Sequence, residues 1–307
     1  MTSSPTLLAE EGIDLDEAIA TNRPTRRSLG RRLHLDTAAV VGWTIVIGVL
    51  AMALLAPLIA PFPPNDTDLR ARLLPPGVLG GSASHVLGTD SLGRDVLSRV
   101  IWGSQLTLLV GVTAVLVGGL IGVTTGVVAG YAGGWWDLVV GRIADVQQAI
   151  PFVILALAVV AVVGASLLNL ILVLGVGSWI FTYRIARAES LRVREQPYVE
   201  AARTLGAGTG RILRAHVLPN IAPPVIVVAT LFVPQVIIYT AGLSFLGLGV
   251  PPPAAEWGRD IAQASEYLRT APWPTLVPSA FLVVTVLGIN LIGDWLRDVL
   301  DPVERSR

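Results

Sequence analysis

The chain has 307 residues, a mean hydropathy of +0.68, 14% charged residues and a formal net charge of zero. A soluble domain cannot carry so much apolar surface without large exposed patches, so the composition indicates a membrane protein with several spans. The chain contains no cysteine, which excludes disulfides and thiol nucleophiles. All 22 basic residues are arginine, and because a P-loop requires a lysine, the chain cannot contain a P-loop.

The first 39 residues are predicted to form a tail outside the membrane. They contain an acidic part, residues 10–17, and an arginine-rich part, residues 23–32. We expect no secretory signal, because no short apolar region with a small-residue cleavage site is present. The apolar stretch 40–60 follows, and at 1.5 Å per residue it is long enough to cross a hydrocarbon layer of about 30 Å.

Residues 61–103 are predicted to form an external loop with an amphipathic segment. Thr89, Asp90 and Ser91 are typical of a helix N-cap. The helix that follows would lie at the membrane surface, with four charged side chains on its solvent face: Asp90, Arg94, Asp95 and Arg99.

The second span is expected at 104–129. Its glycines recur every fourth residue and therefore share one helix face, namely Gly118, Gly122, Gly126 and Gly130. A face without side chains lets another helix backbone approach closely. Packing within the chain and contact with a partner subunit are both compatible with this pattern.

Four further spans are expected at 143–164, 167–183, 221–249 and 276–292, which gives an all-α membrane protein of six helices. The number could also be five or seven, because prolines interrupt the fifth segment. Arg142 and Asp145 lie three residues apart, a helical spacing that favours either an ion pair at the interface or an element of an inner gate.

Arginine placement predicts the orientation of the chain. With the N-terminus inside, 16 arginines fall in cytoplasmic segments and six in external ones. The positive-inside rule therefore favours cytoplasmic N- and C-termini and places residues 184–220 in the cytoplasm.

The 184–220 loop is expected to form a helical elbow outside the membrane. Pro197 suits the first turn of a short helix, Ala201 and Ala202 favour helix without bulk, and Gly206 can end it in a left-handed conformation. A second helix, about 210–218, would end before Pro219. The small-residue face suits a groove in another protein, whereas the arginines also suit lipid headgroups.

Residues 178–220 read SWIFTYRIARAESLRVREQPYVEAARTLGAGTGRILRAHVLPN. This stretch resembles the Glu-Ala-Ala loop of type I ABC importer permeases, in the dipeptide, oligopeptide and nickel branch. Three further stretches resemble the same branch: His85–Asp90 with Gly93–Asp95, Leu243–Gly249 with Trp257-Gly258, and Asn290–Asp294 with Leu300–Pro302. Together they cover residues 85–302, and the longer C-terminal signature resembles the C-type member of a permease pair.

The resemblance implies a type I transmembrane core at 104–293, a C-terminal tail at 294–307 and a multi-pass protein of a prokaryotic cytoplasmic membrane. It implies a heterodimer with a second, similar permease, two ATPase subunits that bind ATP and Mg²⁺, and an extracytoplasmic substrate-binding protein. The chain itself would hold no cofactor, no metal and no catalytic site, and no nucleic-acid partner is expected. The resemblance also gives an alternative to the interpretation of a plain solvent face. In this alternative a docking surface for the binding protein is formed by Asp90, Arg94, Asp95 and Arg99.

In this resemblance, one set of residues would couple ATP hydrolysis to transport: Glu200, Ala201, Ala202, Arg203, Gly206, Leu218 and Pro219. Di- or oligopeptides are the expected cargo, with nickel as the alternative, and the residues that bind the substrate are not predicted. Histidines 34, 85 and 216 lie outside the predicted spans and lack metal-ligand spacing. A passive channel or membrane scaffold is the rival class, although neither needs this loop.

Overall fold

A computed structural model describes residues 36–300 of the chain. Most of the predicted N-terminal tail, up to residue 35, and residues 301–307 lie outside this range. All regular secondary structure in residues 36–300 is helical, apart from an isolated bridge between Thr89 and Asp95. The longer helices are α3 (Thr37–Leu54), α5 (Val96–Ala132), α6 (Gly134–Gln148), α7 (Phe152–Val163), α8 (Leu167–Arg194), α11 (Leu218–Phe245) and α13 (Trp273–Leu300).

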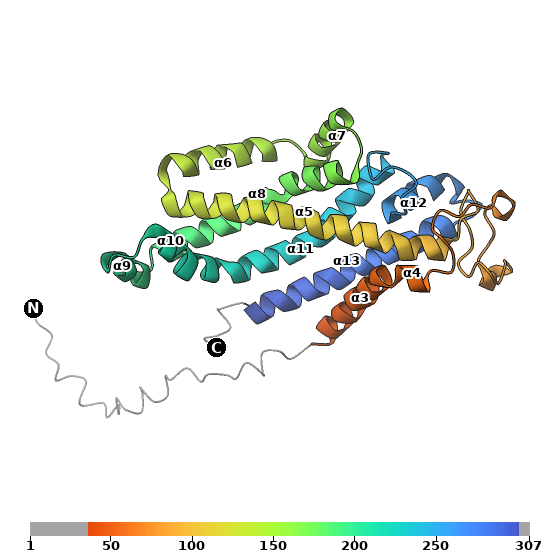
Figure 1. Ribbon diagram of the computed structural model, residues 1–307, viewed down its shortest axis with the longest axis horizontal. Helices are drawn as coiled ribbons and strands as arrows, with labels where there is room; N and C mark the ends of the chain where they lie inside the picture. Colours follow the sequence, from red (N-terminus) through yellow and green to blue (C-terminus); the bar gives the residue numbers. More distant parts are fainter. Residues whose placement is uncertain (1–35, 301–307) are drawn as a thin grey trace, which may run out of the picture. The chain divides into compact units, whose positions relative to one another are not determined.

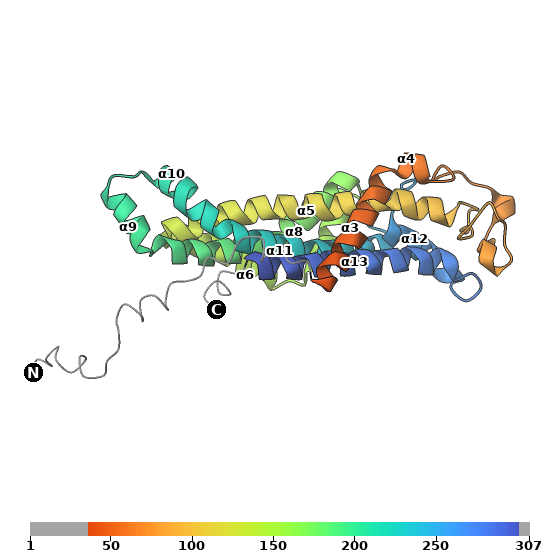
Figure 2. The same ribbon diagram turned by 90° about the horizontal axis from the view of Figure 1, so that it is seen from below.

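Short helices connect the long ones. They are α4 (Ala56–Ile59), α9 (Pro197–Thr204), α10 (Thr209–Ile212) and α12 (Trp257–Ala264). Figure 1 shows α9 and α10 at one end of the long helices, and α12 with the loop before α5 at the other end. The view turned by 90° in Figure 2 keeps these two groups at opposite ends.

Five helices are long and apolar enough to cross a membrane, and the bent pair α6–α7 makes a sixth span if it is counted as one. The predicted all-α membrane fold is therefore confirmed, and the predicted six spans agree with the structure when the bent pair is counted as one span. Residues 164–166 form the short turn expected between the third and fourth spans, and Ser166 caps α8 by accepting a hydrogen bond from the Asn169 N–H.

The third span differs from the prediction of one helix over 143–164. It begins at Gly134 and breaks between Gln148 and Phe152 with a bend of 89°. Pro151 lies in the break, and a proline has no N–H to continue the helical hydrogen bonds.

The helix that carries the second span begins earlier than predicted. Asp95, not the Thr89–Ser91 segment, caps α5, because its carboxylate accepts from the Ser98 N–H at 2.7 Å. In the part of the chain that the structure describes, no helix lies between Thr89 and Asp95. Since α5 has 37 residues, it is about 55 Å long and extends beyond a hydrocarbon layer of about 30 Å.

The prediction that the second helix of the elbow ends at Pro219 is wrong. A π-helical turn, Leu213–Val217, joins α10 to α11, and Pro219 lies in the first turn of α11. A proline is tolerated there because the first N–H groups of a helix need no partner within the helix.

Candidate functional site

The elbow formed by α9 and α10 has a defined turn at Gly206. The backbone of Gly206 has φ of 84°, the left-handed region in which glycine is favoured. Its N–H donates to the Arg203 carbonyl, and the Ala207 N–H donates to the Ala202 carbonyl, both at 3.0 Å. These two bonds form a Schellman motif, so the predicted role of Gly206 as the helix stop is confirmed.

Apolar side chains anchor the elbow to the long helices. Val199 of α9, Ile212 of α10 and Val217 are at most 1% exposed. They belong to one cluster with residues of α5, α8 and α11, namely Val127, Ala186, Val193 and Ile221. The elbow is therefore a packed continuation of the bundle, and a force applied to it acts on three spans.

The other face of the elbow is exposed. Glu200, Ala201 and Arg203 are exposed and Ala202 is partly buried, while Leu218 and Pro219 are exposed at the start of α11. Leu205, a large apolar residue beside Gly206, is 87% exposed. Within residues 36–300 the Glu200 carboxylate forms no ion pair. The outward face of the elbow therefore presents a large apolar side chain and a carboxylate without an ion-pair partner in the described chain.

Tyr131, at the end of α5, contacts the elbow and was not predicted. Its hydroxyl accepts from Arg203 at 3.4 Å, and its carbonyl accepts from Arg194 at 3.2 Å. One residue thus connects α5, the end of α8 and α9. No pattern in the sequence identifies this contact, because Tyr131 and Arg203 lie 72 positions apart.

The glycine face of α5 packs against α8 of the same chain. A Cβ at Gly122 would lie 2.5 Å from the Trp179 carbonyl oxygen, and a Cβ at Gly126 would lie 2.6 Å from that of Tyr183. Gly118 and Gly130 similarly face Gly175 and Arg187 of α8. Of the two alternatives, the structure therefore supports packing within the chain for this face.

Arg142 and Asp145 do not form the expected pair. Asp145 instead lies 3.6 Å from Arg184 of α8, and the two side chains are more than half exposed. A stronger pair on the same two helices joins Asp137 of α6 to Arg187 of α8, with two hydrogen bonds. The pair was predicted from the spacing of the two residues along one helix, but Asp145 pairs with a residue of the neighbouring helix α8 instead.

At the end of the helices opposite the elbow, the four candidate docking residues are buried. Asp90, Arg94, Asp95 and Arg99 are 3–8% exposed, so the prediction that they line a solvent face is wrong. Their charges are neutralised inside the fold instead.

Arg94 donates to Asp90 at 2.6 Å and to Gln263 of α12 at 3.0 Å. Arg99 forms a forked contact with Asp260 of α12, and Asp95 accepts from Ser98 and contacts His85. The network holds α12 against the start of α5.

Two buried carboxyl groups of this region have raised pKa values. Burial raises the pKa of Glu256, which caps α12 by accepting from the N–H groups of Gly258 and Arg259 at 2.9 Å. Burial also raises the pKa of Asp260, against the opposing effect of Arg99. Removal of a charged group from water disfavours its ionised form.

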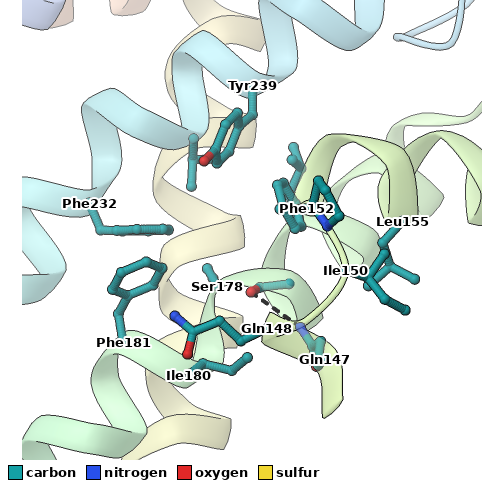
Figure 3. A pocket seen from close by; sticks show the side chains of 14 residues that line it. Gln147, Gln148, Ile150, Phe152, Leu155, Ser178, Ile180, Phe181, Phe232 and Tyr239 are labelled. Atoms are coloured by element: carbon teal, nitrogen blue, oxygen red, sulfur yellow. Dashed lines mark hydrogen bonds between the residues drawn. The ribbon is translucent and has the colours of Figure 1, made fainter. Parts of the chain in front are cut away.

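A cavity lies beside the break between α6 and α7 (Figure 3). Its volume is about 190 Å³, and residues of α6, α7, α8 and α11 line it. Gln147 is held at the floor, because its amide oxygen accepts from Trp179 at 2.9 Å and its nitrogen donates to the carbonyls of Val176 and Gly177. No pattern in the sequence predicted this cavity, and Pro151 was not recognised as a break in the third span.

Two family models match the chain. The model described as binding-protein-dependent transport system inner membrane component matches residues 122–306. The model described as the N-terminal TM domain of oligopeptide transport permease C matches residues 26–76. The first match covers the elbow, the α6–α7 break and α12.

Three curated relatives are similar over most of their length. The dipeptide transport system permease protein DppC of Alkalihalophilus pseudofirmus is 38% identical over 280 residues, which are 91% of this chain and 90% of that protein. The probable D,D-dipeptide transport system permease protein DdpC of Escherichia coli is 40% identical, covering 86% of this chain and 87% of its own. The oligopeptide transport system permease protein OppC of Bacillus subtilis is 37% identical, covering 90% and 88%.

Solved structures give the same fold. An inward-facing conformation of the MetNI methionine ABC transporter matches with a TM-score of 0.53 and 25% identity, covering 66% of this chain and 96% of that one. With the family models and the relatives, this likeness shows that the chain belongs to the binding-protein-dependent transport system inner membrane components, the membrane-spanning permease subunits of ABC importers.

Proposed function

We propose that the chain imports di- or oligopeptides as one half of a heterodimeric pore, together with a second, similar permease. Three relatives that are 37–40% identical are named as dipeptide or oligopeptide permeases, which supports this cargo. Two ATPase subunits bind ATP and Mg²⁺ on the cytoplasmic side, and an external binding protein delivers the peptide. This chain lacks the P-loop lysine and depends on those subunits for energy.

The proposal depends on one observation: the outer face of the elbow is exposed, while its inner side chains are packed into the helix bundle. Glu200, Ala201 and Leu205 face outward, whereas Val199 and Ile212 join the elbow to the core beneath it. In our proposal an ATPase subunit grips the outward face. When ATP binding closes the two ATPase subunits, the elbow moves and tilts α5, α8 and α11, so that the pore opens alternately to each side.

Substitution of Gly206 tests this assignment. We expect Gly206→Trp to assemble in the membrane but to lose peptide uptake driven by ATP, because a bulky side chain stands on the gripped face. Gly247→Trp is the matched control, since Gly247 has φ of 82° and ends α11 with the same pair of hydrogen bonds at the other end of the bundle. Equal uptake by the two variants would contradict the proposal.

The orientation has its own test. Because the chain has no cysteine, single cysteines at Leu205 and Val78 report on the two ends, and both positions are at least 87% exposed. With cytoplasmic termini, a membrane-impermeant thiol reagent added outside intact cells labels Val78→Cys and spares Leu205→Cys. The reverse pattern would overturn the orientation.

A further inference from the structure

The break between α6 and α7 exposes backbone groups within a membrane-spanning segment. Pro151 has no N–H, and within residues 36–300 the carbonyls of Gln148 and Ala149 accept no backbone hydrogen bond. Irregular backbone at membrane depth is tolerated only where it is buried in protein or lines a hydrated cavity. The cavity of about 190 Å³ beside the break is far larger than the roughly 10–15 Å³ that one water needs, so it meets this condition.

Two aromatic pairs form the walls of the cavity. Phe152 of α7 and Tyr239 of α11 have ring centroids 4.8 Å apart, and Phe181 of α8 and Phe232 of α11 have centroids 4.6 Å apart. In Figure 3 the two pairs stand on opposite sides of the cavity, above the glutamines of the break. The aromatic rings are large, apolar and suited to pack against an apolar side chain.

The polar groups of the cavity are uncharged. No Asp, Glu, Arg or His is among its lining residues, and residues 36–300 contain no cluster of three His, Cys, Asp or Glu that could hold a metal ion. Gln147 is occupied by three partners, but the Gln148 amide has no hydrogen-bond partner within the described residues. Figure 3 shows the Gln148 side chain extending along the floor toward Phe181. An amide is a donor and an acceptor, as a peptide bond requires.

From these observations we propose that the cavity is a transient binding site for an apolar or aromatic residue of the peptide in transit. The rings of Phe152, Phe181, Phe232 and Tyr239 enclose the side chain, and Gln148 hydrogen-bonds the peptide backbone. This inference rests on the proposed import of peptides and adds to it a preference that the permease itself imposes. A bare divalent cation would find no charged ligand here.

A cysteine-protection experiment tests occupancy of the cavity. The complete transporter is reconstituted with Ile150→Cys or Leu155→Cys, at lining positions to which the proposal assigns no contact with the peptide. The labelling of this chain by a polar methanethiosulfonate reagent is timed during ATP turnover. Gly-Phe is expected to slow labelling about tenfold and Gly-Asp much less, since an apolar pocket discriminates by factors of this size. Val162→Cys is the control, because Val162 is an exposed residue of α7 outside the cavity, and Gly-Phe leaves its labelling rate unchanged.

Substitution of Phe232 tests the preference. Phe232→Trp narrows the cavity and is expected to lower the ratio of Gly-Trp to Gly-Ala uptake about tenfold. Phe245→Trp, on the exposed end of the same helix, leaves this ratio unchanged.

The possible outcomes distinguish failure of the proposed binding site from failure of the proposed import of peptides. If the unmodified transporter takes up Gly-Phe but shows no protection, or if Phe232→Trp lowers the uptake of all peptides equally, the binding site is wrong and the proposed function stands. Failure of cysteines at 150 and 155 to react at all would mean that the cavity is closed in the assembled transporter, and this also overturns the inference. If the unmodified transporter takes up no peptide, the proposed function itself fails.

Discussion

Arg99 and Asp260 form a buried ion pair although 161 positions separate them in the sequence. The Arg99 Nε lies 2.9 Å from the Asp260 carboxylate, and its Nη1 donates to the Pro64 carbonyl at 2.9 Å. One guanidinium thereby joins the loop after α4, the first turn of α5 and α12. The pair therefore fixes these three segments relative to one another. In our proposal this end of the bundle faces outward, so the pair stabilises the surface on which a binding protein would dock.

Loss of Arg99 is expected to destabilise the protein strongly. Arg99→Met leaves Asp260 buried without its partner, and breaking a buried pair in this way costs about 3–5 kcal/mol. Thermal unfolding in detergent should therefore begin at a clearly lower temperature. The double variant Arg99→Met/Asp260→Leu should recover much of the loss, and Arg269→Met, at an exposed position, should have no effect. An unchanged unfolding temperature for Arg99→Met would show that the pair does not stabilise the fold.

The raised pKa of Glu256 predicts a pH dependence of stability. The folded protein holds the proton of this carboxyl more tightly than the unfolded chain does, so the stabilisation is complete below the ordinary pKa of 4.5. It is lost as the pH rises from there through the raised folded value. The raised pKa of Asp260 acts in the same direction.

Glu256→Gln isolates this contribution, because an amide cannot ionise. The variant should lose less stability than the unmodified protein as the pH rises above 4.5, measured by chemical unfolding in detergent. Glu266→Gln, at an exposed position of the same segment, should keep the original profile. Identical pH profiles for Glu256→Gln and the unmodified protein would contradict burial as the cause.

Close packing of the glycine face of α5 against α8 predicts that alanine is not tolerated at Gly122, and Gly119, three residues away, provides the control. Gly122→Ala places a Cβ 2.5 Å from the Trp179 carbonyl of α8, so the two helices must separate. We expect destabilisation of about 1–3 kcal/mol, as for other overpacked sites. At Gly119 a Cβ meets nothing within 4 Å, and Gly119→Ala should be neutral or stabilise the helix by up to about 1 kcal/mol. Equal unfolding temperatures for the two variants would exclude close α5–α8 packing.

Residues that act through local geometry were predictable from the sequence. The four-residue spacing of Gly118–Gly130 identified a close-packing face, and Gly206 was expected to adopt the left-handed conformation it has. Both inferences depend on rules that hold within one helix or one turn.

Pairings between distant segments were not predictable in this way. Local spacing assigned Asp145 to Arg142, but α8 brings Arg184 to it. Amphipathic spacing assigned Arg99 to solvent, but α12 covers it and supplies Asp260. A lone sequence does not show which helix lies beside which, so the partner of a charged residue follows only from the tertiary fold.

The most direct test of the account asks what touches the elbow. Leu205→Cys is introduced into this cysteine-free chain, and the assembled transporter, with a cysteine in the surface groove of the ATPase subunit, is treated with a short thiol crosslinker. We predict a covalent product of this chain with the ATPase subunit, whose yield changes between the nucleotide-free and ATP-bound states. Val78→Cys, equally exposed at the opposite end, should give none. Absence of the product at Leu205, or an equal yield at Val78, would contradict the assignment of the elbow as the site where the ATPase acts.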